Sequence, residues 1–96
     1  MRNLSESRIE KEVTAYAGRR GWFSRGVQYR GRTGCPDRVF IRDGVTVWVE
    51  FKRFGEEPTE IQKREHQKFR QAGVTVHVID NIPAGEMLFD SFERQT

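Results

Sequence analysis

The pair Asp43-Gly44, set between two segments of alternating apolar and polar residues, restricts the fold of this chain more than any other feature. Both central positions of a two-residue hairpin turn need positive φ, which aspartate and glycine tolerate. The pair therefore predicts that a strand over residues 37–42 runs antiparallel to a strand over residues 45–52. Alternation in the second strand places its valines on one face and Glu50 and Lys52 together on the other.

Further elements are expected on both sides of this hairpin. Apolar spacing predicts helices over about residues 5–20 and 59–72, and strand-like segments cover residues 22–29 and 74–80. A strand–helix–strand connection of this length implies a right-handed crossover to a parallel neighbour. The expected order is α-β-β-β-α-β, an α/β fold whose mixed four-stranded sheet is flanked by helices.

The second predicted helix has clear boundary signals and one anomaly. Thr59 and Gln62 have the spacing of a capping box, and Gly73 is placed to end the helix. Glu65 falls among the apolar residues of this helix, so either the helix is less buried than usual or Glu65 pairs with an arginine. His66, one turn beyond Gln62, is expected to be structural or solvated, although it could approach a site near Gln62.

We expect a single domain over residues 1–96, since the chain has neither repeats nor a linker and is long enough for one core. The core is expected at about residues 5–80. The pattern leaves open whether the remaining segment, residues 81–96, is a short helix or an ordered tail.

Charge is distributed unevenly along the chain. The net charge is +3, but residues 1–42 hold ten Lys/Arg against four Asp/Glu, whereas residues 43–96 hold seven against ten. Within the basic half, arginines alternate with aromatic residues, a combination that suits phosphates and stacked bases. A solvated basic face over an aromatic core explains the segment equally well. The candidate contacts to DNA are Arg19, Arg20, Arg30 and Arg32.

The hairpin also predicts a chemical site. The loop that ends at Pro36 delivers Asp37 to the start of the strand paired with that of Glu50 and Lys52, so two carboxylates and an ammonium should converge. Paired carboxylates suit Mg²⁺, which keeps sites for water and phosphate, and a lysine can offset charge in phosphodiester hydrolysis. A Glu-x-Lys sequence taken alone is more often an exposed surface pair, and only its context favours the site.

The context resembles a known family. The loop "GRTGCPD", the sequence "VEFK" and the segment "PTEIQKREHQKFRQAGVTVHVI" follow one another as in the VRR-NUC family of the PD-(D/E)xK nuclease superfamily, particularly its stand-alone, virus-type members. The resemblance covers about residues 5–80 and implies a restriction-endonuclease-like core. It also implies a Mg²⁺- or Mn²⁺-dependent deoxyribonuclease, with Holliday-junction resolvases as the nearest analogues in size and dimeric habit.

The resemblance also implies roles for individual residues. Asp37 and Glu50 would be metal ligands, Lys52 the catalytic lysine, and Gln62 would position the metal site or the lysine; Gln62 can serve the capping box as well. The family also has a glutamate on its first helix, which contributes to the catalytic metal site. Glu10 has the better spacing for this position and is preferred, while Glu12 is the rival.

Partners and location complete these expectations. The resemblance implies a homodimer, with an interface expected at exposed apolar residues, either Trp22, Phe23 and Phe54 or the tail residues Met87, Leu88, Phe89 and Phe92. The single cysteine, Cys35, fits a reducing cytoplasm, the host cytoplasm if the protein is viral, and no long apolar run predicts a membrane span. The alternative function is a nucleic-acid-binding module that retains the nuclease fold without catalysis.

Overall fold

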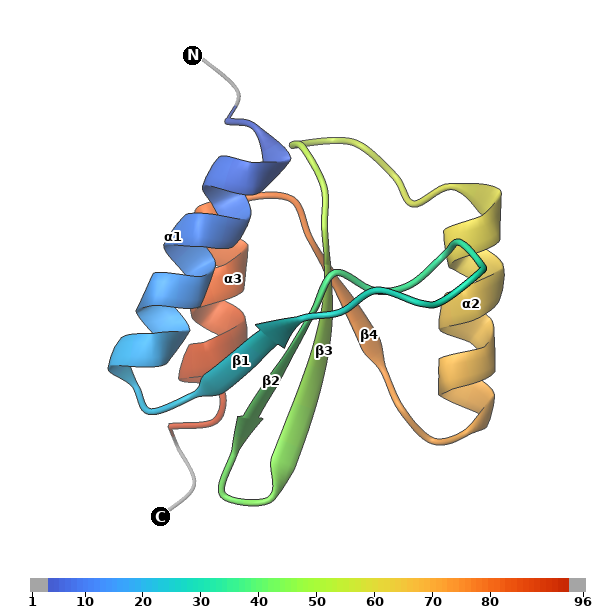
Figure 1. Cartoon of the computed structure of the whole chain (residues 1–96). Coiled ribbons are helices and arrows are strands. Elements are labelled where there is room, and N and C mark those ends of the chain that lie inside the picture. The colour runs from blue at the N-terminus through green and yellow to red at the C-terminus, as the bar shows by residue number, and fades with distance from the viewer. Residues whose placement is uncertain (1–3, 94–96) are drawn as a thin grey trace.

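A computed structural model describes residues 4–93 as a four-stranded sheet with three helices (Figure 1). The elements follow one another as α1 (Glu6–Arg19), β1 (Phe23–Gly26), β2 (Arg38–Arg42), β3 (Val45–Phe51), α2 (Glu60–Gln71), β4 (Val76–Ile79) and α3 (Ile82–Asp90). The strands lie in the order β1-β2-β3-β4. The β1–β2 and β2–β3 pairs are antiparallel and the β3–β4 pair is parallel, so the predicted mixed sheet is confirmed.

The predicted hairpin turn is present between β2 and β3. Asp43 and Gly44 both adopt positive φ, 51° and 79°. The turn sets the register of the two strands, in which Arg42 faces Val45 and Arg38 faces Val49. Because this register is fixed at the turn, it also determines which side chains meet at the far end of the hairpin, where Asp37 and Glu50 lie.

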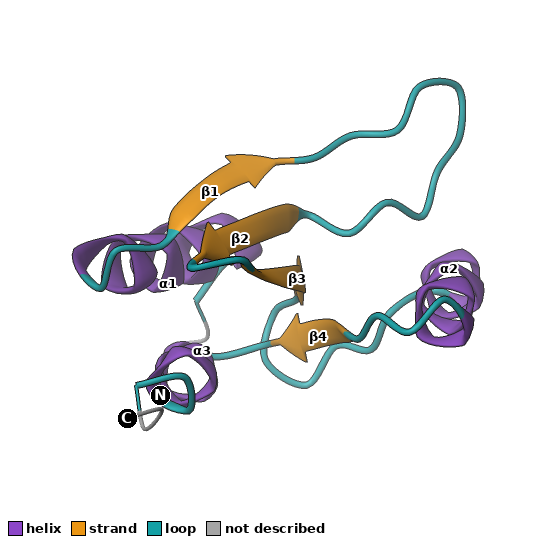
Figure 2. Ribbon diagram, turned by 90° about the horizontal axis from the view of Figure 1, so that it is seen from below, coloured by secondary structure: helices purple, strands orange, loops and turns teal. Residues whose placement is uncertain are grey.

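The first strand is shorter than predicted. It ends at Gly26, and the ladder finishes with a hydrogen bond from the Val27 N–H to the Asp37 carbonyl, at 2.9 Å. From there residues 27–36, which we call the arm, leave the sheet and return to it at β2 (Figure 2). Gly31 and Gly34 have φ of 70° and 94°. These two glycines let the arm reverse direction, which is why the strand pattern does not continue to residue 29.

The main core lies on one face of the sheet, under α1 and α3 (Figure 2). Ile9, Val13 and Ala17 of α1 are buried at the helical spacing that the sequence predicts. Across the interface, three alternate residues of β3 are buried, Val47, Val49 and Phe51. The opposite face of β3 carries Trp48, whose ring packs edge-on against Phe69 of α2 at a centroid distance of 5.3 Å.

The segment after the expected core forms a short helix, one of the two alternatives left open, and this helix is part of the core. The helix, α3, packs against α1 so closely that a Cβ atom at Gly85 would lie 2.5 Å from a methyl carbon of Val13. Phe89 is fully buried and contacts the rings of Trp22 and Phe40 at centroid distances of 5.3 and 4.7 Å. Residues 94–96, at the end of the predicted tail, lie outside the described residues.

These contacts correct the apolar residues expected at a dimer interface. Trp22 is 5% exposed and Phe89 is buried, so both serve the core of their own chain. Phe23, Phe54 and Met87 are 48%, 62% and 71% exposed. Phe89 is buried because α3 covers the sheet, which the apolar pattern of the sequence does not show.

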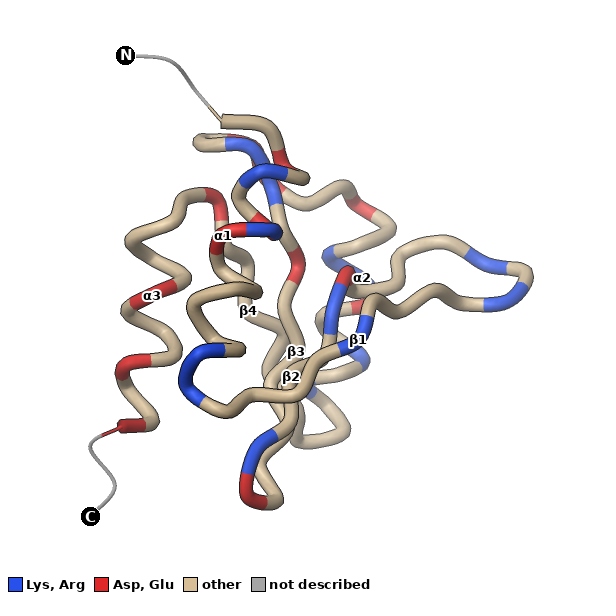
Figure 3. Tube along the Cα trace, turned by 60° about the vertical axis from the view of Figure 1, so that its left-hand side comes forward, with Lys and Arg blue, Asp and Glu red and all other residues tan. Residues whose placement is uncertain are grey.

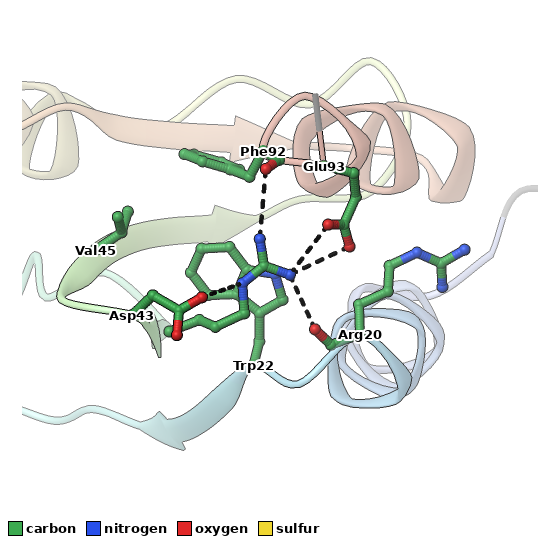
Figure 4. A pocket seen from close by; sticks show the side chains of 7 residues that line it. Arg20, Trp22, Asp43, Val45, Phe92 and Glu93 are labelled. Atoms are coloured by element: carbon green, nitrogen blue, oxygen red, sulfur yellow. Dashed lines mark hydrogen bonds and ion pairs between the residues drawn. The ribbon is translucent and has the colours of Figure 1, made fainter. Parts of the chain in front are cut away.

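Arg42 fastens the end of α3 to the hairpin (Figure 4). Its guanidinium stacks over the Trp22 ring at 4.6 Å and donates hydrogen bonds to the Arg20 carbonyl at 2.9 Å and to the Glu93 carboxylate at 3.2 Å. It also donates to the Phe92 carbonyl at 3.4 Å. A hollow of about 510 Å³ beside it is lined by Arg42 and the residues it contacts, together with Val45. Within residues 4–93, none of the helices combines the length and apolarity of a membrane span.

Candidate active site

Asp37 and Glu50 are brought together by the hairpin register. The Asp37 N–H donates to the Val49 carbonyl at 3.0 Å, and the Phe51 N–H donates to Oδ2 of Asp37 at 2.6 Å. Both hydrogen bonds fix Asp37 across from Glu50, one residue beyond the last ladder pair between Arg38 and Val49. The convergence that the sequence predicts for these two carboxylates is therefore present.

The Glu50 carboxyl group is buried and incompletely satisfied. The residue is 2% exposed, and its Oε1 atom has no hydrogen-bond partner. Burial, followed by the negative charge of Asp37, raises the pKa of Glu50 to about 8, although the nearby Lys52 ammonium acts in the opposite direction. A carboxylate with these surroundings is destabilised in its charged form and would be stabilised by a cation.

Lys52 directly follows β3 and lies two residues after Glu50. Its backbone N–H donates to the Ile79 carbonyl at 2.9 Å, which continues the β3–β4 ladder beyond Phe51. The side chain is 9% exposed. Lys52 lowers the pKa of Glu50, so the ammonium acts on the carboxyl pair as the sequence predicts.

Gln62 serves the capping box and the carboxyl pair with the same amide group. The side-chain Oε1 atom of Gln62 accepts a hydrogen bond from the Thr59 backbone N–H at 2.8 Å. The Gln62 backbone N–H donates to Oγ1 of Thr59 at 3.2 Å. The Nε2 atom, which the first hydrogen bond orients, donates to Oε2 of Glu50 at 2.9 Å. The predicted capping box is confirmed, and it holds the amide in the orientation that Glu50 needs.

His66 is a site neighbour that the sequence prediction undervalued. It is the buried residue of α2, 6% exposed, and its Nε2 atom lies 3.6 Å from Oε1 of Glu50. Neither atom has a hydrogen-bond partner. Burial, followed by the charges of Arg70 and Lys52, lowers the pKa of His66, which favours the neutral ring. The signal in the sequence was its position one helical turn after Gln62.

The first helix carries a third glutamate near the site besides the two considered, and the preference for Glu10 over Glu12 stays a prediction. Glu10 forms an ion pair with Arg38 at 3.0 Å, and Glu12 forms one with Arg8 at 3.1 Å on the outer side of the helix. Glu6 is the α1 carboxyl group whose pKa responds to residues of the site. Partial burial raises the pKa of Glu6, the Lys52 ammonium lowers it, and the charges of Glu56 and Asp37 raise it. The structure thus places Glu6, one turn before Glu10, next to the residues predicted to form the active site.

Comparison with known proteins agrees with this geometry. No family model matches the sequence. A protein named "Putative nuclease p44", from Acyrthosiphon pisum secondary endosymbiont phage 1, is 37% identical over 93 residues, which span 92% of this chain and 96% of that protein. A solved structure described as a VRR_NUC domain superposes with a TM-score of 0.83 at 30% identity, covering 91% of this chain and 96% of the other. The chain belongs to the VRR-NUC nuclease family. The resemblance predicted from the sequence motifs is confirmed.

The carboxyl groups of this VRR-NUC chain fit a divalent cation as a pair. Across residues 4–93, no set of three or more His, Cys, Asp or Glu side chains has a preassembled metal-binding arrangement. Asp37 and Glu50 nevertheless supply adjacent oxygen donors, and the Oε1 atom of Glu50 has no hydrogen-bond partner in the protein. Mg²⁺ is commonly held by one or two carboxylates with water and substrate phosphate in its other positions, so a third protein carboxylate is not required.

The four arginines proposed to contact DNA are not together in this VRR-NUC fold. Arg19 and Arg20 lie at the C-terminal end of α1, whereas Arg30 and Arg32 lie in the arm, on the opposite side of the molecule (Figures 1 and 3). Arg20 is also occupied within the chain, because its guanidinium stacks on Tyr16 at 3.5 Å and pairs with Asp90 at 3.7 Å. The arm arginines are the pair that lies next to Asp37 along the chain.

The arm is fastened to α2 through Glu65. The Tyr29 hydroxyl donates to Oε2 of Glu65 at 2.9 Å, and Arg32 forms an ion pair with Oε1 at 3.5 Å. Burial and the hydrogen bond to Glu65 raise the pKa of Tyr29 to about 12, so the phenol remains a donor. Both explanations offered for Glu65 hold, since α2 is little buried and Glu65 pairs with an arginine. A hollow of about 560 Å³ runs beneath the arm to Asp37.

Proposed function

We propose that this VRR-NUC chain is a Mg²⁺- or Mn²⁺-dependent endonuclease that hydrolyses phosphodiester bonds in DNA. The observation that supports this most strongly is the state of Glu50, a buried carboxyl group with a pKa of about 8 and an unpartnered Oε1 atom beside Asp37. Two ionised carboxyl groups in such a pair repel one another and destabilise the metal-free protein above neutral pH. A bound cation would neutralise this repulsion. A fold kept only for binding DNA has no physical need for it.

Asp37 and Glu50 are the residues that would hold the cation, with Glu6 as the carboxyl group of α1 nearest in electrostatic effect. A bound divalent cation supplies Lewis-acid stabilisation of the phosphate and makes a coordinated water more acidic. The chain keeps Glu50 in place through the Gln62 amide on Oε2 and the His66 ring near Oε1. Hydrolysis forms one bond from water oxygen to phosphorus and breaks one phosphorus–oxygen bond, while the Lys52 ammonium offsets the negative charge on the phosphate oxygens.

We further propose that the substrate is branched or structured DNA, such as a Holliday junction, and that the active species is a cytoplasmic homodimer. Two cuts placed symmetrically on a branched duplex need two like active centres, which a two-fold dimer provides. The exposed apolar side chains of Phe23 and Met87 are available for such an interface. The single cysteine, Cys35, is compatible with a reducing cytoplasm.

Cleavage by site variants tests the proposed chemistry. Labelled four-way junction, flap and duplex DNA would be incubated in Mg²⁺ and in Mn²⁺ with the wild type, Asp37→Asn and Lys52→Ala. The asparagine side chain can still accept the Phe51 N–H, so Asp37→Asn should keep the fold and lose on the order of 10²- to 10⁴-fold in rate. Glu57→Gln, which changes a carboxyl group that is 81% exposed, is the matched control and should cleave normally.

Retention of most activity by Asp37→Asn would contradict the site assignment. Calorimetric titration of the wild type with Mn²⁺, with and without DNA, separates the nuclease from a non-catalytic binding module: the module would bind DNA without binding the metal. Sedimentation at micromolar concentration and the symmetry of nicks on the four-way junction test the dimer. A monomer that nicks one strand would remove both the dimer and the preference for a junction.

A further inference from the structure

Phe54 is an exposed aromatic residue two positions after Lys52. It is 62% exposed, whereas Phe40, Phe51 and Phe89 are at most 1% exposed. Burying a phenylalanine side chain contributes about 1.5 to 3 kcal/mol, so this position leaves an available gain in stability unused. A single exposed apolar residue is ordinary on a protein surface, and its meaning depends on how the chain presents it.

The chain presents Phe54 on a fastened turn. The Glu56 N–H donates to the Arg53 carbonyl at 2.9 Å, and the Glu56 side chain accepts the Arg53 N–H at 3.2 Å. Gly55 has a φ of 82°, and its N–H donates to Oδ2 of Asp80 at 3.0 Å. The two residues on either side of Phe54 are thus tied to the turn itself and to the end of β4. The ring is exposed two residues after Lys52, on a backbone that several hydrogen bonds restrain.

Charge differs between the two connections that leave the sheet at the site. The arm, which enters at Asp37, carries Arg30 and Arg32, whereas the connection after Lys52 is acidic (Figure 3). This connection holds Glu56 and Glu57 against the single cation Arg53, Glu57 pairs with Lys63 of α2 at 3.6 Å, and Asp80 lies against the connection. DNA phosphates are attracted to the arm and repelled by the acidic connection. The charges therefore disfavour a path in which a DNA duplex that follows the arm continues past Phe54.

We propose that Phe54 stacks on the face of a base next to the scissile phosphate where the DNA stack is interrupted. The ring is uncharged and has a flat face, so it can replace a missing neighbouring base at a branch point, a flap or a nick. Continuous duplex offers no free base face at that position. The inference rests on the proposed nuclease function and gives it a source of structure specificity, namely a stacking residue beside the catalytic lysine.

Binding measurements test the stacking without relying on cleavage. The anisotropy of labelled DNA in EDTA would be recorded for a continuous duplex and for a flap duplex of the same sequence. Base–aromatic stacking is worth roughly 1 to 3 kcal/mol, so Phe54→Ala should weaken flap binding about 5- to 150-fold and leave duplex binding within about twofold. Phe54→Trp should retain the flap preference, and Phe54→Leu, which keeps apolar bulk without a π face, should lose it.

Ile41→Ala is the control, since Ile41 is an apolar residue on β2 that is 39% exposed and belongs neither to the proposed site nor to the proposed interface. It should leave the flap preference unchanged. Equal effects of Phe54→Ala on flap and duplex, or no effect on either, would overturn the stacking role, and so would a normal preference in Phe54→Leu. Thermal unfolding of each variant checks that the fold is intact.

The same variants separate this inference from the proposed function. If the wild type cleaves DNA but Phe54→Ala keeps the same flap-to-duplex ratio of single-turnover rates, only the stacking role fails. If the wild type cleaves nothing in Mg²⁺ or Mn²⁺, the nuclease proposal fails, and the binding ratios in EDTA still decide whether Phe54 recognises an interrupted stack.

Discussion

Replacing Glu50 with glutamine should stabilise the metal-free protein at neutral pH and remove its response to metal. The pKa of Glu50 is raised from 4.5 to about 8 in the folded chain, mainly by burial. At pH 7 the folded state must keep this group protonated while the unfolded chain ionises it freely. Each pH unit above the unfolded-state pKa of 4.5 costs about 1.4 kcal/mol while the folded group stays protonated. At pH 7 Glu50 therefore lowers the free energy of unfolding by about 3 kcal/mol.

The sign of the pH dependence follows from the direction of this shift. Because the folded-state pKa is the higher one, the contribution of Glu50 to stability is fully present below pH 4.5, is lost as the pH rises, and levels off above about 8. Glutamine at position 50 has no such loss. Its carbonyl can still accept the Gln62 amide, and its NH₂ group can donate to Asp37, so the site accommodates the change.

Urea unfolding in EDTA at pH 5 and pH 8 measures the effect. The stability difference between Glu50→Gln and the wild type should grow by about 3 kcal/mol between the two values, while Glu57→Gln stays parallel to the wild type. Added Mg²⁺ at pH 8 should then stabilise the wild type and leave Glu50→Gln unaffected. Parallel pH profiles for the wild type and Glu50→Gln would refute the claim that Glu50 is a strained buried carboxyl group.

Two further predictions concern the arm and the packing of the last helix. Arg30→Gln should weaken DNA binding and lower the salt slope by about one unit, whereas Arg19→Gln, at the far end of α1, should change neither; equal slopes for both variants would place the DNA path elsewhere. Gly85→Ala should destabilise the fold by about 1 to 3 kcal/mol in thermal unfolding, since its Cβ would lie 2.5 Å from a methyl carbon of Val13. Gly18→Ala, in an open position of α1, should be neutral or stabilising, and a similar gain at Gly85 would contradict the packing argument.

The placement of Asp37, Glu50 and Lys52 could be predicted because it depends on local rules. Side chains alternate along a strand, and a two-residue turn fixes the register of the two strands it joins. Together these rules put Asp37 opposite Glu50 without knowledge of any other element, and the hydrogen bond from the Phe51 N–H to Asp37 follows from that register. The capping box of Thr59 and Gln62 is likewise a contact between residues three apart.

The residues that the sequence left undecided or misplaced all depend on how a helix docks against the sheet. Helical periodicity identifies the inward face of α1 but not which of its turns lies beside the site, so the choice was made between Glu10 and Glu12 and Glu6 was not considered. His66 becomes a neighbour of Glu50 only because α2 stands over that end of β3. The burial of Phe89 likewise depends on α3 returning across the sheet.

The sequence by itself determined the order of the first six elements, the hairpin register and the three residues at its open end, because each depends on contacts between residues close along the chain. Only the tertiary structure decided that Glu6 lies within electrostatic reach of Lys52 and Asp37, that α3 completes the core and that the arm arginines stand apart from those of α1. The physical reason is that helix docking depends on shape complementarity summed over many side chains, which no local pattern encodes.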